Sequence, residues 1–241
     1  MRGDYSFVIS CEHASAEIPG PWRPVLADYV TTREEHEIWD PGAKQMAQEL
    51  GRLLPSSVFL GEASRLLVDL NRSLNHRAFF SPPMMDIPAA QRTEILCRYY
   101  YPYRHRVLRE IEALLDEKRR VVHLSVHSFV PVIRGTTRKN DFGLLFDPWH
   151  KEENKIAEVW LHYLRQKDRA LVCLPNHPYL GISDGHVPTL RKHLARCPYF
   201  GFELEFNQKL PLSEKAPRYA RWIQETLMHT LESKAVAQAG F

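Results

Sequence analysis

Apolar positions along this chain fall into two kinds of segment, short runs typical of buried strands and longer stretches with helical spacing. Residues 5–10 are β-branched and aromatic, which predicts a buried strand. The stretch 11–25 that follows contains several prolines and a glycine, which predicts a loop.

The clearest helical pattern comes next. Apolar residues recur at helical spacing from Ala43 to Leu54, which predicts one apolar stripe on a helix. Asp40 is a favourable N-cap and Pro41 suits the first helical position, while Pro55 closes the segment.

The remaining elements complete an alternation of strands and helices. In chain order they are strands near 57–60 and 65–69, a proline-rich loop at 81–88, a long helix at 89–120 interrupted at Pro102, strands at 121–126 and 142–146, a helix at 152–166, a strand at 171–174, a short helix at 189–195, a strand at 201–206 and a terminal helix at 213–233. This order predicts an α/β fold of three layers, with helices on both faces of a mostly parallel sheet. Since no stretch is linker-like, residues 1–241 are expected to form a single domain.

Composition narrows the functional classes. The chain has 241 residues, 44% of them hydrophobic and 25% charged, as in ordinary soluble globular proteins. The net charge is +3 and no basic tail is present, so we expect no nucleic-acid partner. No apolar run is long enough to span a membrane, and the start has no signal-peptide pattern. The four cysteines lack metal or disulfide spacing, which favours reduced thiols and a cytoplasmic location; the oligomeric state stays open.

Polar residues gather where predicted strands end, and in open α/β sheets ligands bind beyond the carboxyl ends of the strands. Cys11, Glu12 and His13 follow the first strand. In the segment 121–128, period-two alternation puts His123, Ser125 and His127 on one side. His127 stands at the carboxyl end and is a candidate ligand, whereas His123 lies within the strand and is expected to be a hydrogen-bonded core group or a group that supports the ligands from behind.

Two further strand ends carry charge. At 69–72, Arg72 is placed to grip a carboxylate through two parallel hydrogen bonds, or else an Arg–Asp pair ties down the loop. In the last strand, Glu203 and Glu205 share one face, away from Phe202 and Leu204. Two carboxylates on a central strand are costly unless a metal or a catalytic role accounts for them; the alternative is an edge strand with a solvated acidic face.

Two histidines, a carboxylate and a further free glutamate are the set used by catalytic zinc hydrolases. In such sites the metal activates a water, and a nearby glutamate transfers its proton to the leaving nitrogen.

The sequence resembles the N-formylglutamate amidohydrolase family. The matching segments, in the order of the family, are CEHAS at 11–15, IWDPGA at 38–43, RLLVDLNRS at 65–73, HSFVPVIRGTTR at 127–138, NHPYLGISDGHVPTLRKH at 176–193 and GFELEFNQ at 201–208. The VDLNR stretch is also similar to the carboxylate-gripping Asn-Arg segment of zinc carboxypeptidases. The resemblance therefore implies the fold of those enzymes, the phosphorylase/hydrolase-like fold.

The resemblance implies a zinc-dependent hydrolase that cleaves the amide of a small N-acyl amino acid, and it assigns roles to residues. His13, Asp40 and His127 would bind Zn²⁺, Glu203 would be the general base, Asn71 and Arg72 would hold the substrate carboxylate, and Arg138 would be a second anion contact. Glu12, Glu17 and His36 remain alternatives to Asp40, which is alternatively a simple N-cap, and Glu205 remains an alternative to Glu203. N-formylglutamate itself is one candidate substrate.

Two hypotheses from other classes are available. Cys11 beside Glu12 and His13 suggests a thiol hydrolase, although neighbouring residues on a strand exit point in different directions. The other is a small-molecule or peptide binder on the same fold without catalysis, which would have no need for metal ligands.

Overall fold

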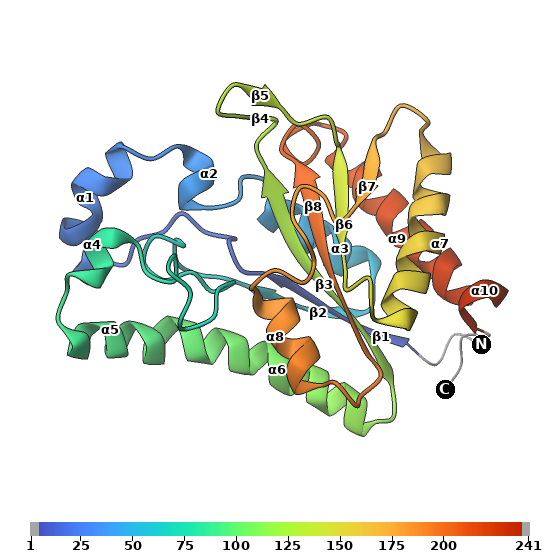
Figure 1. The fold of residues 1–241 in the computed structure, drawn as a ribbon, viewed down its shortest axis with the longest axis horizontal. Helices are drawn as coiled ribbons and strands as arrows, with labels where there is room; N and C mark the ends of the chain where they lie inside the picture. The colour runs from blue at the N-terminus through green and yellow to red at the C-terminus, as the bar shows by residue number, and fades with distance from the viewer. Residues whose placement is uncertain (1–4, 238–241) are drawn as a thin grey trace.

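A six-stranded mixed sheet forms the centre of the computed structural model, which describes residues 5–237 (Figure 1). Its strands are β1 (Tyr5–Cys11), β2 (Ser56–Leu60), β3 (Arg120–Phe129), β6 (Phe142–Leu145), β7 (Cys173–Pro175) and β8 (Tyr199–Asn207). They are ordered β2-β1-β3-β8-β6-β7. The first four in this order are parallel, β6 is antiparallel to β8, and β7 is parallel to β6. The predicted mostly parallel α/β sheet is confirmed.

Helices cover both faces of the sheet, as predicted (Figure 1). The α-helices are α1 (Arg23–Thr31), α2 (Glu35–Ile38), α3 (Ala43–Leu53), α4 (Pro82–Met85), α5 (Ala89–Ile95), α6 (Tyr101–Asp116), α7 (Lys151–Lys167), α8 (His186–His193), α9 (Ala216–Glu232) and α10 (Lys234–Ala237). One face packs on α3, α7 and α9, and the other on α6 and α8 together with the turns between β2 and α4. Within residues 5–237, no helix has the length and apolar character needed to cross a bilayer.

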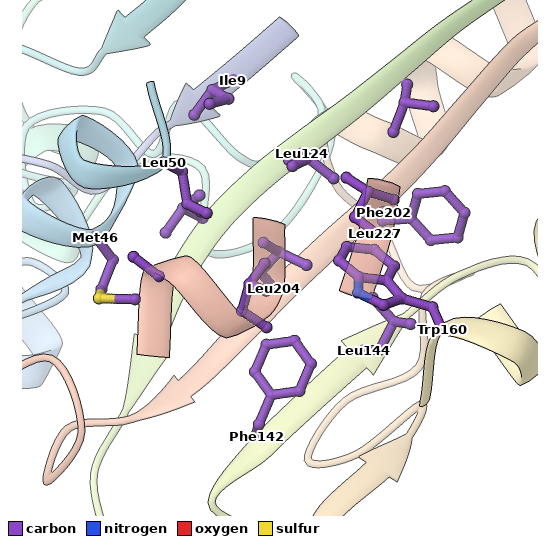
Figure 2. Packing of buried hydrophobic residues seen from close by; sticks show 14 of the residues in the cluster. Ile9, Met46, Leu50, Leu124, Phe142, Leu144, Trp160, Phe202, Leu204 and Leu227 are labelled. Carbon is purple, nitrogen blue, oxygen red and sulfur yellow. The ribbon is translucent and has the colours of Figure 1, made fainter. Parts of the chain in front are cut away.

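Alternation along the strands produces these two cores. Phe7 and Ile9 of β1 face one cluster and Val8 faces the other. Figure 2 shows the first cluster, where Trp160 of α7 meets Phe202 of β8 edge-on, with ring centroids 5.8 Å apart. Both side chains are fully buried, so this contact fixes α7 against the middle of the sheet.

The proline-rich segments contain more helix than the sequence predicts. The predicted loop 11–25 gives way to a 3₁₀ turn, Gly20–Trp22, and then to α1. Pro21 and Pro24 occupy first-turn positions, where a missing N–H costs nothing. Likewise α4 lies inside the predicted loop 81–88, again with proline in its first turn.

The long helix predicted at 89–120 has no break at Pro102. A π-helical turn at Leu96–Tyr100 joins α5 to α6, and Pro102 falls in the first turn of α6. The helix ends earlier than predicted, at Asp116, because β3 begins at Arg120.

Two predicted features were wrong in ways that affect the site. The segment 65–69 forms turns outside the sheet, and its apolar residues Leu66, Leu67 and Val68 pack into the second core. Asp40 is not an N-cap: α3 begins at Ala43 after Gly42, whose φ is 82°. The carboxylate of Asp40 is therefore free for other contacts. The other predicted helices and strands are present, with ends shifted by a few residues.

Two leucines of α3 test the packing of the first core. Leu50 is 0% exposed and Leu53 is 37% exposed. Leu50→Ala leaves a cavity and is expected to lower the free energy of unfolding by about 2–5 kcal/mol. Leu53→Ala, with the same chemistry on the same helix, is expected to cost under about 1 kcal/mol. Urea denaturation measures both values; equal losses would contradict the assignment of the buried face.

Candidate metal centre and substrate pocket

Three side chains from distant parts of the chain meet at the carboxyl ends of β1 and β3. His13 lies just beyond β1, His127 lies near the end of β3, and Asp40 precedes α3. Oδ2 of Asp40 lies 2.9 Å from Nδ1 of His127 and 3.4 Å from Nδ1 of His13. The three residues are buried, and one ligand atom from each lies within 4.8 Å of the others. This group can hold a metal ion.

The local backbone explains why these segments meet. β1 and β3 are adjacent and parallel, so their carboxyl ends lie at the same edge of the sheet. The backbone N–H of Asp40 then donates to the carbonyl of His13 at 3.0 Å, which holds the segment before α3 against the end of β1. The sheet and one backbone bond thus set the spacing of the three ligand atoms.

The outer nitrogen of each imidazole faces a carboxylate. Nε2 of His13 lies 2.8 Å from Oδ1 of Asp69. Nε2 of His127 lies 3.0 Å from the hydroxyl of Ser125 and 3.3 Å from Oε2 of Glu12. Metal-binding histidines typically donate their second N–H to a carboxylate or another acceptor, which leaves the first nitrogen free for the ion. The donor set and its surroundings therefore fit a divalent metal.

Charge in this buried group is balanced by Arg65. Its guanidinium donates to Oδ1 of Asp40 at 3.2 Å and to Oδ2 of Asp69 at 3.1 Å. Burial alone would raise the pKa of both carboxyls, but the His13 charge, Arg65 and hydrogen bonds from the imidazoles hold each pKa below its usual value. Asp40 and Asp69 are thus kept as carboxylates.

The metal group opens into a cavity of about 270 Å³. All of the residues that the sequence assigned to the site line this cavity: His13, Asp40, Asn71, Arg72, His127, Arg138 and Glu203. Glu205 and His36 line it as well, while Glu12 and Glu17 do not. Tertiary structure therefore brings together residues that are spread over the chain from position 13 to position 205.

The alternatives to Asp40 lie outside the three-residue group. Glu12 is fully buried below His127 and faces its outer nitrogen. Glu17 is exposed and pairs with Arg23. His36 is half-buried and lies 3.2 Å from a carboxylate oxygen of Glu34.

Glu203 and Glu205 share the cavity face of β8, as the alternation predicts. In the register with β3, Glu203 lies opposite Ser125 and Glu205 opposite His127. The alternative of an edge strand with a solvated acidic face is wrong. β8 lies between β3 and β6, and the carboxyls of Glu203 and Glu205 are both buried. Burial raises the pKa of Glu203 and raises that of Glu205 to about 7.

The arginines and the asparagine are held by different contacts. The guanidinium of Arg72 donates to the carbonyl of Asp184 at 2.6 Å. That of Arg138 lies between the rings of Phe129 and Tyr179, 5.2 and 5.5 Å from their centroids. The amide oxygen of Asn71 accepts the N–H of His186 at 2.7 Å, so this side chain anchors the start of α8 at the cavity wall.

Sequence reasoning missed two residues of the centre, Asp69 and Arg65. It treated Asp69 as part of a strand end and did not assign it to His13. A usable signal was present in the spacing of Arg65 and Asp69, which are four residues apart in RLLVDLNRS and pair through their side chains. The expected core role of His123 is confirmed: it is fully buried and lies 2.8 Å from the hydroxyl of Tyr199.

The thiol hypothesis is disfavoured by the surroundings of Cys11. Its side chain is fully buried, and it belongs to the apolar cluster on the α3 face of the sheet. Burial and the charges of Asp40 and Glu12 raise the pKa of this thiol well above its usual value. The thiolate that nucleophilic catalysis requires is therefore suppressed.

Comparison with known proteins agrees with this arrangement. The family model for N-formylglutamate amidohydrolase matches residues 5–211. The chain belongs to the N-formylglutamate amidohydrolase family. The match covers all of the residues that line the cavity, so the whole candidate site lies within the part shared with the family. No curated protein matches the chain significantly in sequence.

Several solved structures are similar to this chain. The crystal structure of gene product Atu2144 from Agrobacterium tumefaciens is 26% identical, with a TM-score of 0.79, over 95% of this chain and 91% of that chain. An N-formylglutamate amidohydrolase from Ralstonia eutropha is 16% identical, with a TM-score of 0.64, over 97% and 94%. A succinylglutamate desuccinylase from Chromobacterium violaceum is 14% identical, with a TM-score of 0.42, over 97% and 62%.

Two histidines of the cavity test the metal group. His127→Ala removes one of three ligands and is expected to abolish stoichiometric zinc binding, whereas His36→Ala is expected to retain about one zinc per chain. Metal analysis after dialysis against zinc and then buffer gives the ratio. Loss of zinc in the His36 variant, with retention in the His127 variant, would overturn the ligand assignment.

Proposed function

We propose that this protein is a zinc-dependent amidohydrolase that cleaves the amide bond of an N-acyl amino acid with an acidic side chain. One observation carries the proposal: a buried His-Asp-His group opens into a cavity that is also lined by two glutamates and three arginines. The family to which the chain belongs supports the reaction class.

Two further expectations have support in the structure. The four cysteines are unpaired, which supports the expected cytoplasmic location. Both apolar cores pack on one sheet, which supports the expected single domain.

His13, Asp40 and His127 would hold the metal, with three protein ligands and an open position as catalytic zinc sites require. Bound zinc supplies a Lewis acid that polarises the scissile carbonyl and increases the acidity of a water. Asp69 and Glu12 contact the outer nitrogens of the two imidazoles, whose Nδ1 atoms face Asp40. Zinc is the metal that we assign, because the nitrogen and carboxylate donors match its preferred set.

A glutamate of β8 would accept the proton of the attacking water and pass it to the leaving nitrogen. The sequence expectation named Glu203, but the strand register favours Glu205, because Glu205 lies level with the ligand His127. Glu203 lies two residues, or roughly 6.6 Å, farther along β8 from the carboxyl ends, opposite Ser125. Oε2 of Glu205 is buried and has no hydrogen-bond partner among the described residues. We therefore propose that Glu205 is the base and that Glu203 only lines the cavity beside it.

A pKa near 7 suits that role. Desolvation raises the pKa of Glu205 to about 7, and the nearby charges of His127, Asp40, Glu203 and His13 act on it as well. A base of this kind both accepts and returns a proton near neutral pH. A divalent cation held by the three ligands would add positive charge to the site and would favour the ionised form of this carboxyl.

The arginines would select the substrate. Arg72 lines the cavity from the turn after Asp69, and Arg138 lines it from the segment after β5 (Thr136–Thr137), which forms a small hairpin with β4 (Val132–Ile133). Each guanidinium is half-buried and offers a bidentate contact for a carboxylate. Asn71 would support the Arg72 side of the cavity through its bond to α8.

A matched pair of variants tests the base. Glu205→Gln is expected to reduce kcat about 10²- to 10⁴-fold, because the amide cannot accept the proton, while zinc content is unchanged. Glu203→Gln is expected to lose much less. Steady-state rates on a panel of N-formyl and N-acetyl amino acids, with zinc content measured in parallel, give the comparison. If only Glu203→Gln is inactive, the base is Glu203, as expected from sequence.

The same panel separates the proposed enzyme from a binding protein on the same fold. A wild-type protein that binds these compounds with zinc present and hydrolyses none of them would exclude the amidohydrolase proposal.

Arg72 is tested with two substrates that differ by one side-chain charge, N-formylglutamate and N-formylglutamine. Arg72→Gln removes a charged hydrogen bond of about 1.5–3 kcal/mol, so kcat/KM for N-formylglutamate is expected to fall roughly 10- to 150-fold, with a much smaller loss for N-formylglutamine. Arg77→Gln, an exposed arginine outside the cavity, is the control. Equal losses for both substrates would remove the proposed role of Arg72.

A further inference from the structure

Glu12 is a fully buried carboxylate that lies against His127, one of the three candidate metal ligands. Four donor groups surround it. Oε1 accepts the hydroxyl of Ser10 at 2.8 Å and lies 3.0 Å from Nδ1 of His186. Oε2 accepts the hydroxyl of Ser125 at 2.7 Å and lies 3.3 Å from Nε2 of His127. A carboxylate offers about four acceptor sites, so these contacts use all of them.

The hydroxyl of Ser10 is itself oriented toward Glu12 by a chain of hydrogen bonds. Nε2 of His123 lies 2.9 Å from the Ser10 hydroxyl, and Nδ1 of the same ring lies 2.8 Å from the hydroxyl of Tyr199. Since the Ser10 proton goes to Glu12, the Ser10 oxygen accepts from His123, and the free nitrogen of His123 accepts from Tyr199. The chain of bonds has one consistent direction, and it ends on Glu12.

His186 connects Glu12 to the wall of the cavity. It is the first residue of α8, and its backbone N–H donates to the Asn71 amide oxygen at 2.7 Å. Asp184, two residues before His186, lines the cavity, and its backbone carbonyl accepts a hydrogen bond from Arg72. Nε2 of His186 is buried without a hydrogen-bond partner among the described residues. Glu12 is therefore the polar contact that orients this ring.

We propose that Glu12 is a positioning residue that holds His127 in the tautomer needed for metal binding and couples it, through His186, to the substrate side of the cavity. This inference rests on the proposed metal site. Without a metal, the Asp40 carboxylate 2.9 Å from Nδ1 of His127 favours a proton on Nδ1, whereas a metal held there would need the lone pair of Nδ1 and the proton on Nε2. Glu12 accepts only, so it favours a proton on Nε2.

A contact from Asn71 also competes with Glu12 in setting the tautomer of His127. The amide nitrogen of Asn71 lies 3.4 Å from Nε2 of His127, and a donor there favours the opposite tautomer, with the proton on Nδ1. Glu12 and the Ser125 oxygen, at 3.3 and 3.0 Å, lie closer. An amide at position 12 would add a second donor beside Nε2 and shift the balance toward the tautomer that cannot bind metal.

The experiment measures the zinc affinity of Glu12→Gln by competition with a chromophoric chelator. A loss of about 10- to 100-fold relative to wild type is expected, as for other residues that orient a metal-binding histidine. Long-range ¹H–¹⁵N spectra of histidine-labelled, metal-free protein provide a second readout: the neutral Nε2–H form of His127 is expected to be less populated in Glu12→Gln than in wild type.

Controls separate positioning from general destabilisation. Leu227→Ala, in the fully buried part of α9, is expected to lower the free energy of unfolding without changing zinc affinity. His186→Gln is expected to keep zinc affinity near the wild-type value and to raise KM more than it lowers kcat. Should Glu12→Gln fail to fold, Ser125→Ala removes a hydroxyl shared by Glu12 and His127, and it is expected to weaken zinc binding several-fold.

The outcomes are distinguishable. Wild-type zinc affinity in Glu12→Gln, or in Ser125→Ala if that variant is used, overturns the role of Glu12 and leaves the amidohydrolase proposal intact. A zinc affinity that falls equally in Leu227→Ala assigns the effect to stability and overturns positioning. A wild-type protein that binds no zinc overturns both proposals.

Discussion

The burial of the Asp40 carboxylate is the constraint on which the rest of the site depends. A charged group removed from water is costly unless other charges and hydrogen-bond donors surround it. Here His13, His127 and Arg65 supply them, and the three come from the end of β1, the end of β3 and the turns after β2. The fold must therefore bring these segments together before the carboxylate is stable in its position.

The order of strands provides this convergence. β1, β3 and β8 are neighbours and run parallel, so three sets of polar residues emerge at the same edge of the sheet. The histidines come from the first two strands, and the glutamates come from the third. β6, antiparallel to β8, brings Leu145 opposite Glu203 and closes the cavity on that side. The apolar cores on both faces hold the strands in this register.

Groups of opposite charge surround His13, Asp40 and His127. Asp69 and Glu12 contact the outer nitrogens of the imidazoles, and Arg65 joins Asp69 to Asp40. Glu203 and Glu205 lie on the cavity side, where burial raises their pKa values above those of exposed carboxyls. Some buried carboxylates in the site are thus held charged by close partners, while others, with fewer partners, retain a proton more readily. The same residue type serves different purposes because its surroundings differ.

The sequence by itself determined the α/β class, the face shared by Glu203 and Glu205 and the core position of His123, because strand periodicity is a local property of the chain. Its family motifs also named the assigned site residues, all of which line the cavity. Only the tertiary structure decided that Asp40 contacts two histidines and does not cap α3, and that 65–69 forms turns outside the sheet. It also decided that Glu12 faces the outer nitrogen of His127 and that Glu205 is level with that residue. Those results depend on strand register and on contacts between segments up to 174 residues apart, such as Glu12 and His186, which no local pattern encodes.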